Sequence, residues 1–249
     1  LNGFQFYDSG TAAVEAGLRV LRAATGRNEI ASCFYDFHGK TYNAVSLGHI
    51  RSQVYGRVRA PGSHMLPRPD TYRPIWTKPD GTIDTDQYLA FYAEYLDKAT
   101  VGDVAGFCLE PIQGWGGSVM PPDDFFPKLR KFCDERKLLL MADEVLTGWG
   151  RTGKWLCMEH WGVVPDIVTL GKGFGNGFPV TAVAVREPHR ESFESISASS
   201  SYGGNPMACA AALASTEVIQ EENLLEHASF LGEVALKRMQ RMLTEHRIV

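Results

Sequence analysis

The amino-acid sequence predicts an α/β fold in which helices sandwich a mostly parallel sheet. Apolar runs of strand length alternate with segments of helical periodicity along the chain, as expected for strand–helix–strand units. The 249 residues are 44% hydrophobic, which is enough to bury one large core. No linker, repeat or low-complexity segment interrupts the sequence. We therefore predict a single domain over residues 1–249.

The first third of the chain is expected to contain two strands, one helix and one long loop. Val14, Leu18 and Leu21 share one face of the helix, and Gly26 is its stop signal. The loop is rich in Pro, Gly and Arg, and long loops in compact domains are often functional. The expected elements are a strand over 2–7, a helix over 12–24, a strand over 30–35 and an ordered loop over 51–82.

The remainder of the chain predicts further strands and helices in alternation, followed by two consecutive helices. The last helix has an apolar stripe that includes Phe230, Leu231 and Leu236, and we expect it to be helix core or dimer surface. The expected strands cover 104–109, 138–142, 167–170 and 180–185, and the expected helices cover 84–98, 123–136, 205–220 and 224–243.

Composition argues against several classes of partner. The net charge is −4, with basic and acidic residues well mixed, so neither nucleic acid nor an anionic membrane is an expected partner. No apolar run approaches the roughly 20 residues that span a bilayer. The five cysteines are odd in number, and neither they nor the histidines have metal-ligand spacing, so no metal site is expected. Free thiols favour a reducing compartment, and we expect a cytoplasmic protein.

Lys172 is the first candidate for chemistry. It follows the strand expected over 167–170 and lies between Gly171 and Gly173, so little side-chain bulk surrounds it. The stretch does not fit the phosphate-binding P-loop, in which Lys follows the glycines and precedes Ser or Thr. An ordinary loop lysine explains the same residues, and the pattern alone leaves both interpretations open.

Asp143 is the second candidate. It follows an apolar strand, and a buried acid at a strand end is costly unless it is paired. In doubly wound sheets, ligands bind outside the carboxyl ends of strands. A helix cap or a buried ion pair is the alternative. Glu144 comes next and is expected to point to the opposite face.

Ser9, Gly10 and Thr11 precede the first helix and form the third candidate. Hydroxyls and N–H groups at a helix N-terminus bind anions, although an ordinary N-cap explains the same residues. Together, the three candidates provide a phosphate cradle, a carboxylate and a lysine amine. Pyridoxal phosphate requires all three, because the carboxylate holds its ring nitrogen and the lysine forms its Schiff base.

Seven ordered motifs then make the sequence recognisable, and they extend over nearly the whole chain. It resembles the class III, or omega, aminotransferases of fold type I, which use pyridoxal phosphate. The resemblance implies the large cofactor-binding domain of that fold. The motifs are Ser9-Gly10-Thr11 with Val14-Glu15-Ala16, Phe37-His38-Gly39-Lys40-Thr41, Glu110-Pro111-Ile112-Gln113-Gly114, Asp143-Glu144-Val145 with Thr147-Gly148-Trp149-Gly150-Arg151-Thr152-Gly153, Pro165-Asp166-Ile167, Lys172 with its glycines, and Tyr202-Gly203-Gly204-Asn205-Pro206.

The resemblance assigns roles to the matching positions. Lys172 and Asp143 are the implied catalytic residues, as the Schiff-base lysine and the acid that keeps the ring nitrogen protonated. Phe37 is implied to stack on one ring face and Val145 to pack on the other. The implied cofactor-binding set also contains Ser9, Gly10, Thr11, His38, which we expect to be structural, Glu110 on the substrate side, and Ser201, where the family usually has a Thr that reaches the phosphate of the neighbouring subunit.

Two departures bear on the substrate. Members that act on ornithine, acetylornithine or 4-aminobutyrate usually have a second acid where this chain has Trp115, and Gln where it has Leu146. A tryptophan makes the pocket more apolar and removes a charged gate. We interpret both changes as favouring amine or other omega-amino donors, and lineage drift is the alternative.

The implied activity is ping-pong transfer of an amino group from such a donor to a keto acid, in a homodimer with shared active sites. Family members are longer, with an N-terminal segment and a C-terminal small domain, so we expect residues 1–249 to be the large domain alone. Class III racemases, aminomutases and decarboxylases use the same Lys and Asp and stay open as alternatives. A non-catalytic cofactor-binding fragment is the remaining alternative.

Overall fold

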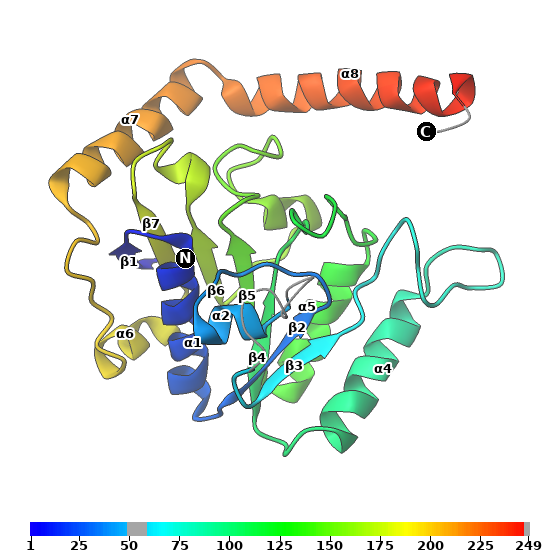
Figure 1. Ribbon diagram of the computed structural model, residues 1–249, viewed down its shortest axis with the longest axis horizontal. Helices are drawn as coiled ribbons and strands as arrows, with labels where there is room; N and C mark the ends of the chain where they lie inside the picture. Colours follow the sequence, from blue (N-terminus) through cyan, green and yellow to red (C-terminus); the bar gives the residue numbers. More distant parts are fainter. Residues whose placement is uncertain (49–58, 247–249) are drawn as a thin grey trace.

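The structure is a computed structural model that describes residues 1–48 and 59–246, and it has a seven-stranded sheet at its centre (Figure 1). The strand order is β1-β7-β6-β5-β4-β2-β3. Every pairing from β6 to β3 is parallel, whereas β7 is antiparallel to both β6 and β1. The strands are β1 (Gly3–Tyr7), β2 (Glu29–Cys33), β3 (Ser63–Leu66), β4 (Val104–Leu109), β5 (Leu139–Glu144), β6 (Ile167–Leu170) and β7 (Thr181–Val185).

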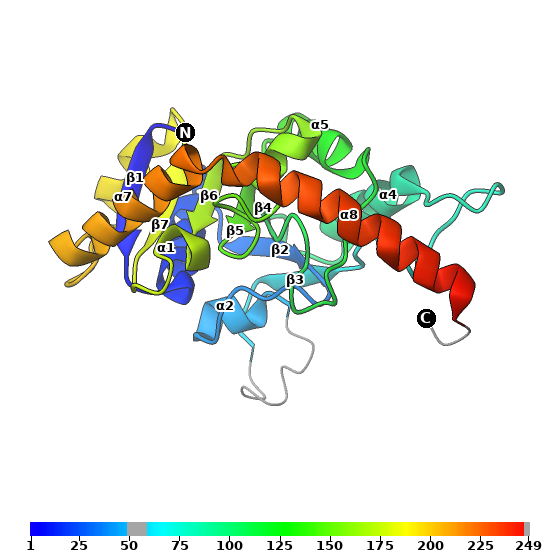
Figure 2. The same ribbon diagram turned by 90° about the horizontal axis from the view of Figure 1, so that it is seen from above.

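Helices cover both faces of the sheet, as Figures 1 and 2 show. Helix α1 packs across β4, β5, β6 and β7 on one face, and α5 packs on β5 from the other with α4 beside it. Short 3-10 turns cover Cys157–Trp161, Lys172–Phe174 and His189–Glu191. The α-helices are α1 (Gly10–Thr25), α2 (Tyr42–Ser46), α4 (Thr85–Lys98), α5 (Phe125–Arg136), α6 (Ser192–Ser195), α7 (Pro206–Glu221) and α8 (Leu224–Glu245).

Successive side chains of the central strands point to alternate faces of the sheet and so divide the interior into two cores. Cys108 and Met141 belong to the core under α1, whereas Phe107 and Leu140 belong to the core under α4 and α5. Successive strand residues point to opposite faces, so the same alternation continues to the strand ends. Asp143 therefore lies on the α1 side of β5, and its neighbour Glu144 lies on the other.

The predicted α/β fold and mostly parallel sheet are confirmed, but the loop expected over 51–82 is wrong in part. Residues 63–66 form β3, which pairs in parallel with β2 from Ile30 opposite Ser63 to Cys33 opposite Leu66. The segment Ser-His-Met-Leu is short and only half-buried, so hydrogen bonding to β2 defines it more than its composition does. Residues 51–58 of the expected loop lie outside the described residues.

The apolar stripe of α8 is exposed, and none of the helix's residues is buried within the described chain. Phe230, Leu231 and Leu236 each expose at least half of their surface. The expectation that this stripe is core is therefore wrong, and the expectation of a dimer surface stays a prediction. In Figure 1, α8 runs above the sheet from the end of α7.

Residues 1–48 and 59–246 contain neither a candidate membrane-spanning helix nor a candidate metal-binding cluster. No helix there combines the length and the apolar character that crossing a membrane requires. No three His, Cys, Asp or Glu side chains in those ranges are grouped so as to hold a metal ion.

Candidate active site

A cavity of about 320 Å³ lies where the carboxyl ends of β4 and β5 meet the N-terminus of α1. Pockets of roughly this size and larger bind small molecules in proteins. The cavity brings together most of the site residues predicted from the sequence; Ser9 and Ser201 are the exceptions. Its lining residues are Gly10, Thr11, Phe37, His38, Gly39, Lys40, Glu110, Asp143, Val145, Leu146 and Lys172.

Asp143 is nearly inaccessible, at 3% exposure, and each of its carboxylate oxygens has a partner. His38 Nδ1 lies 2.8 Å from Oδ2, and Oδ1 accepts hydrogen bonds from Thr169 Oγ1 at 2.9 Å and from the Val145 N–H at 3.2 Å. These contacts offset the cost of burying the acid. Each carboxylate oxygen accepts about two hydrogen bonds, so Oδ2 keeps capacity for a donor in the cavity.

His38 lies behind Asp143 and is also buried. Its Nε2 is 3.7 Å from Asp36 Oδ2, so the imidazole lies between two carboxylates. Burial by itself lowers the pKa of His38, but the Cys108 thiol, the hydrogen bond with Asp143 and the contact with Asp36 raise that pKa well above the ordinary range. The expected structural role of His38 agrees with this position, since the ring supports Asp143.

Lys172 begins a 3-10 turn directly after β6, and its side chain is exposed where it lines the cavity. Its φ is 45°, in the left-handed region that non-glycine residues rarely adopt. Hydrogen bonds from the Gly175 and Asn176 N–H groups to the Lys172 carbonyl hold this conformation. Strained residues of this kind are concentrated at functional sites.

The N-terminus of α1 contributes Gly10 and Thr11 but not Ser9. The Ser9 hydroxyl accepts the Ala12 N–H at 3.3 Å, so Ser9 is the N-cap of α1, which was the alternative interpretation. A Cβ on Gly10 would lie 3.1 Å from Val145 Cγ1, so a larger residue there would have to displace the Val145 side chain by a few tenths of an ångström. The Thr11 hydroxyl is 2.9 Å from that of Thr41.

Aromatic and acidic groups form the opposite wall. The Phe37 N–H donates to Glu110 Oε2 at 2.7 Å, and burial raises the pKa of Glu110 to about 8. The rings of Phe37 and Trp115 stack with centroids 5.3 Å apart. Leu146 packs against Gly114, and a Cβ at position 114 would overlap the end of the Leu146 side chain. Both departures from the family pattern thus lie in or beside the cavity.

Ser201 is exposed in the segment between α6 and α7 and does not line the cavity. Its contact with the phosphate of a neighbouring subunit stays a prediction.

Sequence reasoning gave no role to several residues of this region. Gly39 has a φ of 133°, and a Cβ there would overlap the Thr11 side chain, so this position requires glycine. The glycine of the Phe37-His38-Gly39 motif was the sequence signal that could have indicated this. Thr169 bonds Asp143 from the adjacent strand, where strand pairing places it opposite that residue. Asp36 had no signal of its own.

The chain matches the class-III aminotransferase family over residues 3–249. It is 38% identical over 237 residues to an acetylornithine aminotransferase of Methanosarcina mazei, covering 95% of this chain and 54% of that protein. It is 36% identical over 245 residues to a leucine/methionine racemase of Thermococcus litoralis, covering 97% and 55%.

Solved structures with the same fold include an amine transaminase from an uncultivated Pseudomonas species in a PLP-bound form. Its TM-score is 0.89 at 31% identity, covering 99% of this chain and 59% of that one. The chain spans little more than half of the length of these relatives. The match nevertheless extends over nearly all of its own residues and agrees with the motifs found in the sequence. The chain therefore belongs to the class-III aminotransferase family.

Proposed function

We propose that the chain binds pyridoxal phosphate in this cavity and helps to move an amino group from an amine or omega-amino donor to a keto acid. The observation that carries the proposal is that one cavity joins Lys172, the buried Asp143 and the N-terminus of α1. Family membership supports it, as does the name of a similar structure, a taurine:2-oxoglutarate aminotransferase from Bifidobacterium kashiwanohense in complex with PLP and glutamate.

The residues present fit this cofactor. The first N–H groups of α1 and the Thr11 hydroxyl suit a phosphate group. Asp143 Oδ2 has the acceptor capacity to hold a protonated ring nitrogen. Phe37 and Val145 line the cavity as apolar groups that suit the two faces of an aromatic ring. Lys172 supplies the amine that binds the cofactor covalently.

The chemistry divides among these residues. Bound pyridoxal phosphate supplies an electron sink for the carbanion that forms at the substrate carbon. Asp143 keeps the proton on the ring nitrogen, because a carboxylate favours a nearby positive charge. Lys172 Nζ, freed when the substrate amine replaces it, would take the proton from the substrate carbon as a general base and later return a proton as a general acid.

The walls of the cavity support amine or omega-amino donors without a second carboxylate. Leu146 lines the cavity and Trp115 stacks on Phe37, which also lines it, so this region offers apolar surface where relatives of the ornithine group usually have an acid and a glutamine. A carboxylate that lies against Leu146 or the ring face of Trp115 would lose hydration there. Amine transaminases among the similar structures agree with this choice.

Racemisation is the second candidate, because one relative at 36% identity is named a leucine/methionine racemase. A racemase returns the proton to the substrate carbon from the other side, so no keto acid accumulates. Measuring keto acid and new amino acid together distinguishes the two reactions. Inverted amino acid alone would overturn the aminotransferase proposal.

We also propose a homodimer with shared active sites. Exposed Ser201 and its exposed neighbour Tyr202 support a contact with a second copy in this region. Sedimentation equilibrium measures the assembly directly. A protein that stays monomeric with cofactor bound would contradict the dimer.

The absorbance spectrum tests the proposed function. The purified protein is mixed with pyridoxal phosphate and then with an amine donor without acceptor. A yellow band that bleaches on addition of the donor is the expected result. A band that no donor bleaches would favour the racemase or a non-catalytic binder, and no band at all would contradict cofactor binding by this chain.

A further inference from the structure

A row of buried polar side chains extends from Asp143 through His38 to Asp36, which does not line the cavity. His38 is 3% exposed and Asp36 is 1% exposed. The His38 ring contacts Asp143 with Nδ1 at 2.8 Å and Asp36 with Nε2 at 3.7 Å. His38 thus connects Asp143, which lines the cavity, to Asp36, which has no role in the proposed reaction.

Asp36 is itself held by two donors. Its Oδ2 accepts the Cys33 N–H at 2.9 Å, and its Oδ1 accepts Gln113 Nε2 at 2.6 Å. The other end of the Gln113 amide, Oε1, accepts Arg68 Nη1 at 2.5 Å. A guanidinium only donates hydrogen bonds, so Arg68 fixes the amide with its NH₂ toward Asp36. This arrangement suits an ionised Asp36.

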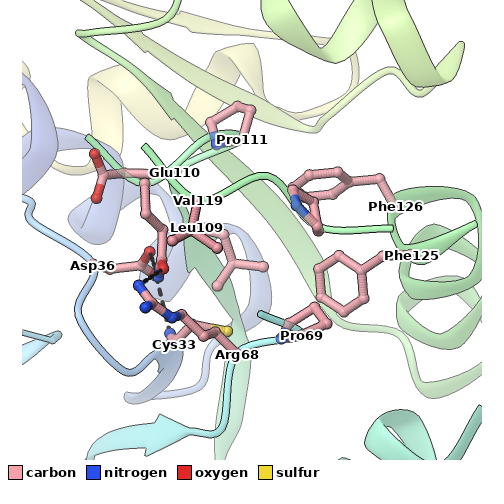
Figure 3. Close-up of a pocket in the computed structure, with 12 residues that line it drawn as sticks. Cys33, Asp36, Arg68, Pro69, Leu109, Glu110, Pro111, Val119, Phe125 and Phe126 are labelled. Carbon is pink, nitrogen blue, oxygen red and sulfur yellow. Dashed lines mark hydrogen bonds between the residues drawn. The ribbon is translucent and has the colours of Figure 1, made fainter. Parts of the chain in front are cut away.

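Arg68 is anchored in turn. It pairs with Asp70 at 2.8 Å, donates to the Gly116 carbonyl at 3.2 Å and lies over the Tyr35 ring at 4.7 Å. Figure 3 shows Asp36, Arg68 and Cys33 at one end of a small cavity of about 20 Å³, with Phe125 and Phe126 at the other.

The same arginine holds the segment that carries Trp115. Gln113 and Gly116, both bound to Arg68, flank that residue, and the Trp115 ring stacks on Phe37. The Asp36 clamp, by which we mean Asp36, Gln113 and Arg68, thus contacts both the support of Asp143 and the wall of the cavity.

Among residues 1–48 and 59–246, four titratable groups face the His38 ring. Asp36 and Asp143 are acids in hydrogen-bond or ion-pair contact with it. Cys108 Sγ is 3.8 Å from each ring nitrogen, and burial raises the pKa of this thiol. Glu110 lies nearby, and its pKa of about 8 leaves it mostly protonated at neutral pH. The two aspartates are therefore the negative charges beside the ring.

We propose that Asp36 is a positioning residue that keeps His38 doubly protonated, so that the Nδ1–H orients and balances the Asp143 carboxylate. The effect of Asp36 on a bound cofactor rests on the proposed function, whereas its effect on the charge of His38 is independent of that function. The competing explanation is that Asp36 merely caps the backbone at Cys33.

Nitrogen-15 NMR of the histidine rings, recorded without added cofactor, tests the charge. The His38 signals are assigned by their loss in His38→Gln. We expect both ring nitrogens of His38 to carry protons at neutral pH, and we expect Asp36→Asn to lower the midpoint of its titration by at least about one pH unit. A wild-type His38 with a single ring proton, or an unchanged midpoint in the variant, would overturn the proposal.

Asp166→Asn is the matched control. Asp166 is also buried, at 3% exposure, and bonds Arg130 at 2.7 Å before the start of β6, away from His38. This variant is expected to lose stability without shifting the His38 signals. Gln113→Leu is the second variant, because it retains Asp36 and removes only its clamp. It should shift His38 in the same direction by a smaller amount, and no shift would overturn the role of the clamp.

The holoenzyme provides a second readout. We expect Asp36→Asn to weaken pyridoxal phosphate binding several-fold and to move the pH midpoint of the visible band, while Asp166→Asn leaves both unchanged. Unchanged binding and an unchanged midpoint in Asp36→Asn would reduce Asp36 to a backbone cap. A wild-type protein that shows no band contradicts the proposed function alone, because the NMR result is obtained without cofactor.

Discussion

Asp143 and Glu144 are neighbours in β5, and their carboxylates lie on opposite faces of the sheet. Asp143 bonds His38 beside the cavity, whereas Glu144 accepts hydrogen bonds from Thr147 Oγ1 at 2.6 Å and from the Cys157 and Met158 N–H groups at 2.9 Å each. Two adjacent acids of similar burial therefore serve different purposes, one in the site and one in the fold.

Substitution of the two acids by their amides separates these roles. Asp143→Asn should lower turnover by about 10²–10³-fold, the usual loss when one electrostatic stabiliser is removed, and should still bind some cofactor. Both carboxylate oxygens of Glu144 accept hydrogen bonds, so Glu144→Gln places an NH₂ donor where an acceptor is required. It should lower the free energy of unfolding by about 1–3 kcal/mol and leave the cofactor band unchanged.

Denaturant unfolding and visible spectra measure both effects in both variants. The reverse pattern, with stability lost in Asp143→Asn and the band lost in Glu144→Gln, would refute the assignment of faces to functions.

Lys172→Ala should abolish transamination, because the variant lacks both the covalent anchor and the base. Removing a general base alone costs about 10²–10⁴-fold in rate. Borohydride reduction followed by mass spectrometry should attach the cofactor to Lys172 in the wild type and to no residue in the variant. Lys131→Ala, on the exposed face of α5, is the control and should retain activity. Full activity of Lys172→Ala would exclude the mechanism.

Much of this site was predictable because parallel strands end at a common edge. Asp143 lies near the carboxyl end of β5 and Lys172 follows β6. The two strands are neighbours, so their order in the sequence predicted that the two residues meet. The two-residue alternation of a strand likewise predicted that Asp143 and Glu144 diverge. These predictions required only local patterns and the rules of parallel sheets.

The support behind Asp143 was not predictable in the same way. Asp36 reaches His38 because the chain turns sharply at Tyr35, which has a φ of 68°, and Gln113 approaches it from another loop. Loop conformations of this kind depend on tertiary contacts rather than on periodicity. Ser9 illustrates a different limit, because one hydroxyl at a helix start suits both an N-cap and an anion site, and only geometry chooses between them.

Glu110 makes stability depend on pH. Its pKa of about 8 exceeds the ordinary value of 4.5, so between these two values the folded protein holds a proton that the unfolded chain releases. Stability should therefore fall as pH rises through that window, by at most about 1.4 kcal/mol per pH unit for one proton.

Glu110→Gln cannot titrate, so its free energy of unfolding relative to the wild type should rise steadily from about pH 4.5 to 8. Urea unfolding at a series of pH values measures this difference. A difference that stays constant from pH 4.5 to 8 would show that the pKa of Glu110 is not raised in the folded protein.

Trp115 lies beside the wall of the cavity. It stacks on Phe37 with ring centroids 5.3 Å apart yet exposes 59% of its surface, so we expect part of the ring to contact a bound donor. An aromatic contact contributes about 0.5–1.5 kcal/mol beyond its buried area, so Trp115→Ala should lower kcat/KM for an arylalkyl amine by roughly 2- to 10-fold more than for a short alkyl amine. Tyr72→Ala, an exposed aromatic outside the cavity, is the control and should affect both amines alike. Equal losses for the two donors in Trp115→Ala would mean that Trp115 positions Phe37 without contacting substrate, and the preference for apolar donors would have to arise from Leu146 instead.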